Sequence, residues 1–268
     1  MIPKKSLGQH FLKDKNIIRK IIKEADLRKD EIALEIGAGK GELTIPLSKE
    51  AGHVIAIEKD KELCNILEEK IKEEGIRNIT VINEDILKWD FSNLPKKTTV
   101  LGNIPYNISS PLIERLIENR SLIKKAIIMF QLEFAERLIA SAGSKKYGAI
   151  SVIVRYFADI KKLFYVSKNV FYPRPKVDSM VVMIRFKEDV EEIDEEIFKK
   201  TVHSAFAYRR KNLLNSMFRY FKSERPDLKK EQIEEAIRRC NIEPEIRAES
   251  LTVDDFLRLY FQLKEFLR

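Results

Sequence analysis

The four residues that begin at Asn103 and end at Tyr106, Asn-Ile-Pro-Tyr, follow an apolar run and could bind an amino group on a flat ring. The side-chain oxygen of Asn103 and a carbonyl of the rigid Ile104–Pro105 step can accept the hydrogens of that amine. Acceptors in these positions favour a pyramidal nitrogen and stabilise the charge that develops when the nitrogen attacks an electrophile. The ring of Tyr106 can stack on the flat ring that bears the amine, such as a nucleic-acid base. This order of residues predicts chemistry at an aromatic amine, and a capped turn under an aromatic lid is the alternative.

A glycine-rich turn in the stretch EIALEIGAGKGELT follows an earlier apolar run. Gly37, Gly39 and Gly41 permit a tight turn in which backbone N–H groups approach a ligand at the start of a helix. A dinucleotide-binding fingerprint would have glycine at position 42, where this chain has Glu42, so the spacing argues against a nicotinamide cofactor. The pattern that starts at Glu35 resembles the first motif of the S-adenosylmethionine-dependent methyltransferases. A purely steric strand-to-helix corner is the alternative.

Carboxylates end the next two predicted strands. Glu58 closes a strand about twenty residues after the glycines, where a carboxylate can accept both hydroxyls of a ribose. Asp85 closes the following strand, where it can accept a hydrogen bond from the exocyclic amine of an adenine. Parallel strands share one carboxyl edge, so we expect the glycine turn, both acids and Asn103 to surround one nucleoside ligand. A solvated strand end is the alternative for either acid alone.

The elements that must position these residues alternate between apolar strand-type runs and amphipathic helical segments. This alternation is typical of an α/β fold with a mostly parallel sheet covered on both faces. The periodicity predicts a first helix within residues 14–27, behind an N-cap at Asp14. Strands are predicted within residues 31–39, 53–60, 78–85, 98–106 and 125–133, and helices within 41–51, 61–75, 111–119 and 133–142.

The alternation changes in the last hundred residues. Two strand-type runs, 160–167 and 179–186, lack a helix between them, so we expect an antiparallel hairpin at an edge of the sheet. Pro173 and Pro175 predict a loop between the two strands. Beyond about Ile193 the pattern is helical, over residues 196–218, 229–240 and 252–267. We therefore predict a catalytic domain of residues 1–188 and a small all-α domain of residues 189–268.

Composition narrows the class of protein. The 268 residues carry a formal net charge of +8, which favours a polyanionic partner such as nucleic acid. No apolar run reaches the roughly eighteen residues that a membrane helix needs. The N-terminus lacks the apolar segment of a secretory signal, so we expect a cytoplasmic protein. Two cysteines and three dispersed histidines have no spacing that predicts a disulfide or a metal site, so we expect no bound metal. We also expect the protein to be a monomer.

Basic residues gather at two places that could contact RNA. Arg209, Arg210 and Lys211 form a run on a predicted helix, and Lys4 and Lys5 lie near the N-terminus. Neighbouring cations can follow a folded RNA backbone. A solvated helix face is the alternative.

Five ordered motifs resemble the ribosomal RNA adenine dimethyltransferases across nearly the whole chain. They are KKSLGQHFL, EIGAGKGELT, GNIPYNISSP, FYPRPKVDS and AFAYRRKNLLNS. The resemblance implies a Rossmann-like class I methyltransferase sheet, S-adenosylmethionine as cofactor and a helical RNA-binding domain. It also implies the transfer of two methyl groups to each of two adjacent adenosines in the last hairpin loop of small-subunit ribosomal RNA, within a late assembly particle.

The resemblance also implies roles for single residues. Asn103, Pro105 and Tyr106 would hold the target adenine, and Phe171 would either stack on it from the opposite side or anchor its loop. The family often has Asn where this chain has His10, and a backbone contact is compatible with either residue. The residues that would bind the cofactor are His10, Leu12, Gly37, Gly39, Glu58, Asp85 and Asn103.

Two other functions are compatible with parts of the sequence. A non-catalytic nucleic-acid-binding factor could retain this fold, but it would have no chemical need for Glu58, Asp85 and Asn103 together. A DNA adenine or large-subunit ribosomal RNA adenine methyltransferase would share the same chemistry. The motif PRPKVDS and the long helical tail favour the small-subunit group by resemblance.

Overall fold

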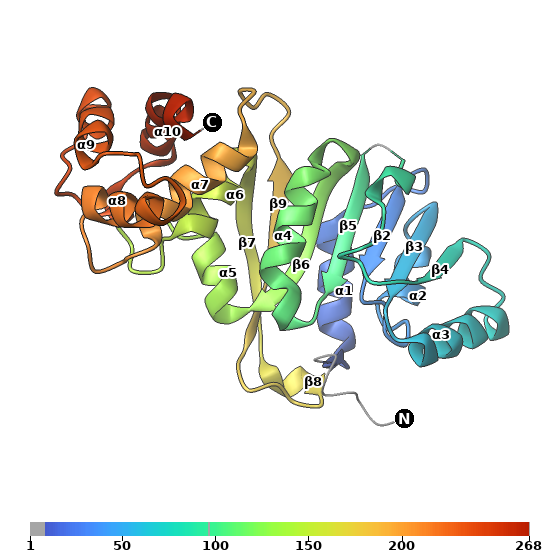
Figure 1. Cartoon of the computed structure of the whole chain (residues 1–268). Helices are drawn as coiled ribbons and strands as arrows, with labels where there is room; N and C mark the ends of the chain where they lie inside the picture. Colours follow the sequence, from blue (N-terminus) through green and yellow to red (C-terminus); the bar gives the residue numbers. More distant parts are fainter. Residues whose placement is uncertain (1–8, 96, 268) are drawn as a thin grey trace. The chain divides into compact units, whose positions relative to one another are not determined.

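The computed structural model describes residues 9–95 and 97–267, and its first unit contains a seven-stranded sheet (Figure 1). The strand order is β4-β3-β2-β5-β6-β9-β7. Strand β9 runs antiparallel to both of its neighbours, whereas the other neighbouring pairs are parallel. The predicted α/β fold, mostly parallel with an antiparallel hairpin at one edge, is confirmed. The strands are β2 (Ile32–Ile36), β3 (His53–Glu58), β4 (Ile79–Asn83), β5 (Thr98–Asn103), β6 (Ile123–Gln131), β7 (Ala158–Val166) and β9 (Ser179–Phe186).

The strand order reverses between β2 and β5. These strands are neighbours in the sheet although β3 and β4 separate them along the chain. In sheets of this kind, the crevice beyond the carboxyl ends of two such strands is where ligands bind. Because Ile36 pairs with Gly102, the glycine turn after β2 and Asn103 on β5 come to lie side by side.

Helices cover both faces of the sheet (Figure 1). Asp14 caps the first helix by accepting hydrogen bonds from the N–H groups of Asn16 and Ile17, as predicted. This helix buries Ile18 and Ile21 against the sheet, so replacing Ile21 with alanine should cost about 2–5 kcal/mol of folding free energy. The helices α1 (Lys15–Ala25), α2 (Thr44–Ser48) and α3 (Lys61–Glu73) pack on one face and α4 (Ser109–Glu118) on the other, with α5 (Leu132–Leu138) following β6.

The segment between β7 and β9 is more ordered than the two prolines predict. It contains the two-residue strand β8 (Phe171–Tyr172), which pairs antiparallel with β1 (Phe11–Leu12). The N–H of Lys13 extends this pairing by donating to the carbonyl of Val170 at 2.9 Å. Pairing stops before Pro173, which has no N–H to donate. The loop prediction missed this pair because the two strands are far apart in the sequence.

A second unit consists of Glu136–Phe157 and Asp189–Arg268 and is helical. The change of unit after Glu188 coincides with the predicted boundary, but residues 136–157 group with the helices and not with the predicted domain of residues 1–188. Tyr156 accounts for part of this grouping. Its ring packs on the Phe198 ring with the two centroids 4.7 Å apart, and its hydroxyl donates to the carbonyl of Glu191. The helices are α6 (Ala149–Phe157), α7 (Glu195–Phe206), α8 (Leu213–Glu224), α9 (Lys230–Arg239) and α10 (Val253–Leu267).

The predicted helix over residues 196–218 is wrong in its middle, because residues 207–212 form a turn between α7 and α8. Asn212 explains the break, since its side chain accepts from the N–H of Asn215 and so begins a new helix. The basic run that starts at Arg209 therefore lies on a turn. Within the described part of the chain, we find no helix of the length and apolarity that a bilayer-spanning segment requires.

Candidate active site

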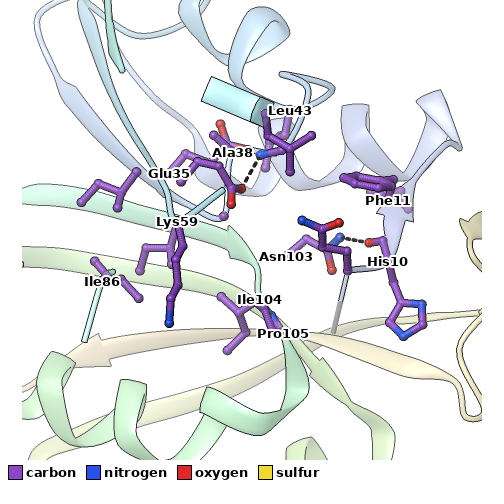
Figure 2. A pocket seen from close by; sticks show the side chains of 18 of the residues that line it. His10, Phe11, Glu35, Ala38, Leu43, Lys59, Ile86, Asn103, Ile104 and Pro105 are labelled. Atoms are coloured by element: carbon purple, nitrogen blue, oxygen red, sulfur yellow. Dashed lines mark hydrogen bonds between the residues drawn. The ribbon is translucent and has the colours of Figure 1, made fainter. Parts of the chain in front are cut away.

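A pocket lies at the carboxyl edge of the sheet, where the strand order reverses (Figure 2). The glycine turn after β2, the acidic end of β3, the segment after β4 and the Asn-Ile-Pro-Tyr segment on β5 all contribute to its wall. Sequence segments that were predicted to meet at one sheet edge are thus brought together in one cavity. The predicted site residues that line it are His10, Leu12, Gly37, Gly39, Glu58, Asp85, Asn103, Pro105 and Tyr106.

The glycine turn has a backbone that other residues would adopt only with strain. Gly37, Gly39 and Gly41 have φ angles of +74°, +58° and +86°. At position 41, a Cβ atom would lie 2.5 Å from Cδ1 of Leu67, so a side chain there would require the buried Leu67 side chain to move. At position 37, a Cβ would lie 3.4 Å from the carbonyl oxygen of Asn103. The turn thus packs closely against the strand that bears the predicted catalytic asparagine.

Glu58 is largely buried in the wall of the pocket and is held by backbone N–H groups. One carboxylate oxygen accepts from the N–H of Gly39 at 2.9 Å, and the other accepts from the N–H of Asp60 at 2.9 Å. Burial raises the pKa of this carboxyl despite these hydrogen bonds, which act in the opposite direction. The side chain therefore joins the glycine turn to the end of β3, where a bound ribose was predicted.

Asp85 lies two residues beyond the end of β4 and is more exposed than Glu58. Its carboxylate accepts a hydrogen bond from Nζ of Lys59 at 2.8 Å and from the N–H of Leu87 at 3.1 Å. Burial alone would raise the pKa of Asp85, but these two donors outweigh it and hold the pKa below its usual value. The acid is thus ionised at neutral pH and is able to accept a hydrogen bond from a ligand.

Asn103 is oriented by the N-terminal segment. Its amide nitrogen donates to the carbonyl of His10 at 3.0 Å, as Figure 2 shows. An amide group that donates on one side presents its oxygen on the other, so Oδ1 is the atom available to accept hydrogens from a ligand. This orientation is the one that the predicted chemistry at an amine requires.

Tyr106 begins a short 3₁₀ turn directly after Pro105. Its hydroxyl shares a hydrogen bond of 3.0 Å with the hydroxyl of Ser179, the first residue of β9. The ring of His10 stacks on the Tyr106 ring at a centroid distance of 5.8 Å. Burial raises the pKa of Tyr106, so the phenol remains protonated at neutral pH. The ring is therefore fixed in position by two contacts, neither of which was predicted.

Residues 9–12, which we call the strap, line the pocket and contact three separate segments of the sheet-bearing unit. The side chain of Gln9 donates to Asp60 at 2.9 Å, and the ring of Phe11 lies so close to Gly39 that a Cβ there would be 3.5 Å from it. Nδ1 of His10 is 2.7 Å from the carbonyl oxygen of Pro173. The strap was predicted as a cofactor contact through His10 and Leu12, but its links to the catalytic segment have no local sequence signal.

Glu35 is a pocket residue to which sequence reasoning gave no role. Only 3% of its surface is exposed, and its Oε2 has no hydrogen-bond partner among the described residues. Burial, with a smaller contribution from the charges of Glu42 and Glu58, raises the pKa of Glu35 to about 8. A buried carboxyl oxygen that lacks a donor is costly, so a ligand group that donates to Oε2 would be bound strongly. Its position at the head of the glycine motif was the signal that could have identified it.

Phe171 is placed differently from the other predicted catalytic residues. It is 5% exposed and packs in the core cluster with Leu12 and Val166, and it does not line the pocket. This arrangement is the loop anchor that the sequence left open as an alternative. Stacking of Phe171 on a target base would require the ring to leave this core, and it stays a prediction.

The predicted RNA contacts of the helical unit are not among the residues that line the pocket. Lys4 and Lys5 lie outside the described residues. Arg210 and Lys211 are exposed on the turn between α7 and α8. Nη2 of Arg209 donates to the carbonyls of Lys145 and Tyr147 at 3.1 and 3.3 Å and lies 3.6 Å from a Glu249 oxygen. Arg209 therefore stabilises its own unit, whatever further role it has.

Comparisons with known proteins agree along nearly the whole chain. Residues 3–264 match the family described as ribosomal RNA adenine dimethylase. The chain is 40% identical over 263 residues to the ribosomal RNA small subunit methyltransferase A of Desulforapulum autotrophicum, an alignment that covers 97% of this chain and 91% of the relative. The protein of the same name from Mycoplasma mobile is 41% identical over 260 residues, with 97% and 98% covered.

Solved structures give the same answer. A dimethyladenosine transferase from Plasmodium falciparum matches with a TM-score of 0.83 and 31% identity, over 95% of this chain and 98% of that one. The 23S rRNA methyltransferase ErmE matches with a TM-score of 0.69 and 27% identity, over 95% and 99%. The motifs, the pocket at the strand ends and these relatives lead to one conclusion, that this chain belongs to the ribosomal RNA adenine dimethylase family of methyltransferases.

Proposed function

We propose that this enzyme transfers methyl groups from S-adenosylmethionine to the exocyclic amines of two adjacent adenosines in the 3′-terminal hairpin loop of small-subunit ribosomal RNA. The orientation of Asn103 is the observation that carries the proposal. Because the amide nitrogen is bonded to His10, the amide oxygen is the atom that can meet an incoming amine. An acceptor at the end of β5, in the wall of the pocket, supports chemistry on an amino nitrogen.

The chain's own residues fit the proposed cofactor. Glu35 is a buried carboxyl whose Oε2 lacks a partner among the described residues, and an ammonium group such as that of the cofactor's methionine would satisfy it. Glu58 and Asp85 would accept hydrogen bonds from the ribose and the adenine, and the N–H groups of the glycine turn would approach the methionine end. When bound, S-adenosylmethionine would supply an electrophilic methyl group on a sulfonium.

The residues of the Asn-Ile-Pro-Tyr segment would act on the target amine. Its nitrogen lone pair is delocalised into the adenine ring, and acceptors for its hydrogens favour the pyramidal form in which the lone pair is available. Asn103 Oδ1 would accept one hydrogen and the Ile104 carbonyl another, which stabilises the charge that develops on nitrogen. Tyr106, fixed by Ser179 and His10, would stack on the base after it leaves its helix. Holding the target amine in line with the methyl group of the cofactor would account for the remaining acceleration.

The helical unit would serve RNA binding. Arg210 and Lys211 are exposed cations on one turn, which suits contacts with phosphates. We propose that the natural substrate is a small-subunit precursor particle in the cytoplasm, and that the enzyme acts on it as a monomer. The motif FYPRPKVDS and the relatives named for the small subunit favour this particle over other RNAs.

The test is transfer of a tritiated methyl group from labelled S-adenosylmethionine to small ribosomal subunits that lack the modification, followed by nucleoside analysis. We expect dimethyladenosine with the wild-type enzyme and a loss of about 100-fold or more in rate with Asn103→Ala. Asn93→Ala is the matched control, because Asn93 is exposed on a surface turn and its side chain donates to the nearby carbonyl of Asp90. That variant should methylate at the wild-type rate.

Large subunits and DNA in the same assay examine the alternatives. Methylation of large-subunit RNA in preference to small subunits would assign the enzyme to the activity that the name of ErmE describes. Label in DNA alone, or in cytosine, would refute the proposal. Binding of small subunits without any transfer of label would favour a non-catalytic assembly factor.

A further inference from the structure

Exposed large apolar side chains occur on the loop between β7 and β9 and at the end of β7. The described residues have five large apolar side chains that are exposed, and three of them fall between residues 165 and 177. Tyr165 and Tyr172 are each 55% exposed, and Val177 is also exposed. An exposed phenol ring offers an apolar face on which a flat ligand can stack.

The ring of Tyr172 is mounted on a fixed backbone. Its neighbour Phe171 is buried in the core, and both residues pair with the strap through the register of Phe11 with Tyr172 and Leu12 with Phe171. The N–H of Lys13 donates to the carbonyl of Val170 on the same segment. A ring held in this way loses little conformational freedom when it binds a partner, which favours affinity.

Tyr172 lies one residue from a direct contact with the active site. The carbonyl oxygen of Pro173 is 2.7 Å from Nδ1 of His10, and the His10 ring stacks on Tyr106. The exposed ring is therefore linked by two contacts to the residue that would hold the target base. An RNA strand that delivers an adenosine to Tyr106 must continue on both sides of it, so its neighbouring nucleotides pass this part of the surface.

One cation contacts the Tyr172 ring, and two more are exposed on the same loop. Nζ of Lys13 lies 4.2 Å from the ring centroid, in a cation–π contact. Arg174 and Lys176 are exposed on the same loop, and the nearby acid Asp178 accepts from the N–H of Lys168. An aromatic ring with an ammonium group against it, on a loop that bears further cations, matches a nucleotide, which combines a flat base with a phosphate.

We propose that Tyr172, with Lys13 beside it, forms a stacking platform for an unpaired base of the substrate RNA next to the target adenosine. The base stacks on the phenol ring, and Lys13 lies near the adjoining phosphate. This inference rests on the proposed function, because it assumes that an RNA hairpin loop is the substrate. It adds a contact within the sheet-bearing unit to the cations expected on the helical unit.

The test measures binding of a fluorescently labelled synthetic RNA hairpin, with the sequence of the 3′-terminal small-subunit loop, to the full chain. Tyr172→Ala should weaken binding between about fivefold and a hundredfold, the range for losing one stacked base. Tyr172→Phe keeps the ring and should bind as the wild type does. Cofactor binding to Tyr172→Ala, measured by calorimetry, should be unchanged and shows that the variant is folded.

Tyr165→Ala is the matched control. Tyr165 has the same exposure and also a lysine over its ring, Lys162 at 4.1 Å, but it lies on the edge strand β7. Three strand spacings, about 14 Å in total, separate β7 from β5, which bears Asn103. We expect the affinity of Tyr165→Ala to stay within about twofold of the wild type, well under the loss of one stacked base.

Abasic hairpins identify the base. Removing the base that stacks on Tyr172 should lower wild-type affinity to that of Tyr172→Ala, and the variant should lose nothing further on that RNA. Three results would overturn the platform. The first is that Tyr172→Ala binds the hairpin with wild-type affinity, and the second is that Tyr172→Ala and Tyr165→Ala lose equal affinity. The third is that the loss from Tyr172→Ala adds to the loss from an abasic site at every position tested. Methyl transfer by the wild-type enzyme is scored separately: its absence refutes the proposed function, whereas transfer together with any of these three results refutes the platform alone.

Discussion

The pocket at the sheet edge and the basic turn between α7 and α8 use charged groups in opposite ways. In the pocket, Glu58 is buried and both of its oxygens are held by backbone N–H groups. On the turn, Arg210 and Lys211 are exposed to solvent. Chemistry on a small ligand depends on dipoles fixed beforehand, whereas attraction of a polyanion depends on the number of accessible cations. We therefore expect the two regions to respond differently to mutation, pH and salt.

Arg209 shows that a basic residue of this turn can also be held in fixed contacts, as the charged groups of the pocket are. It belongs to the same basic run as Arg210, yet its guanidinium bonds two carbonyls and approaches Glu249. Those partners connect residues 145–147, 209 and 249 within the helical unit. A sequence motif of adjacent cations can thus combine a structural residue with RNA-binding candidates.

The largest expected effect is on stability and comes from the buried acid Glu35. The pKa of Glu35 in the folded protein is about 8, above its ordinary value of 4.5, so folding favours the protonated form. Its contribution to the free energy of unfolding is fully present below pH 4.5 and is lost as pH rises towards 8, by at most about 5 kcal/mol. Denaturant unfolding of cofactor-free wild-type and Glu35→Gln enzyme between pH 5 and 9 measures this difference.

The glutamine variant should gain stability relative to the wild type as pH rises. Glu73→Gln, an exposed acid at the end of α3, is the control and should follow the wild-type curve. Parallel pH profiles for the wild type and Glu35→Gln would contradict a neutral carboxyl in the pocket.

The next largest effect is on cofactor affinity. Glu58→Ala removes the anchor of Gly39 and Asp60 together with the proposed ribose contact, and it should raise the dissociation constant for S-adenosylmethionine roughly 100-fold, or about 3 kcal/mol. Isothermal titration calorimetry gives this constant. Affinity for the RNA hairpin should be unchanged, because Glu58 is largely buried in the pocket wall and has no proposed contact with RNA. A parallel loss of RNA affinity would show that the two regions are coupled.

A smaller effect separates the members of the basic run. The double change Arg210→Ala and Lys211→Ala should weaken RNA binding about tenfold and reduce its logarithmic salt slope by about 1.5. Arg209→Ala should instead lower the thermal stability of the protein, since it loses two carbonyl contacts. Hairpin binding from 50 to 300 mM salt and thermal melts measure the two quantities. An unchanged slope in the double variant would identify the turn as an ordinary solvated surface.

The smallest effect concerns the hydroxyl pair that orients Tyr106. Ser179→Ala and Tyr106→Phe each remove one partner of the same hydrogen bond, and each should lower kcat/KM about fivefold, or about 1 kcal/mol. The double variant should be no worse than either single variant, because only one bond is lost. Methyl-transfer kinetics on small subunits decide the point, and additive losses would mean that the hydroxyls act separately.

Much of the pocket could be predicted because its residues follow apolar runs. Glu58 and Asn103 each end a strand of a parallel sheet, and such strands place their carboxyl ends together. The glycines of the turn could also be predicted, since their positive φ angles leave a compositional trace. These features are local, so a single sequence contains them.

Contacts that join distant segments could not be predicted in this way. The bond between Asn103 and the carbonyl of His10, and the pairing of Phe11 with Tyr172, leave no periodic pattern in either segment. The turn at Asn212 was missed because the apolar helical pattern continues through it. The break depends on the hydrogen bond that the Asn212 side chain accepts from a backbone N–H, which the pattern does not reveal. Burial of Phe171 was likewise decided by packing and not by its motif.

The pairing of the strap with β8 has a consequence for the order in which the pocket is completed. His10 and its contact Pro173 are separated by 163 positions, so a chain emerging from the ribosome forms its glycine turn long before the strap can settle. Asn103 is oriented by that strap. Competence for catalysis is therefore acquired late, only after well over half of the polypeptide has been synthesised.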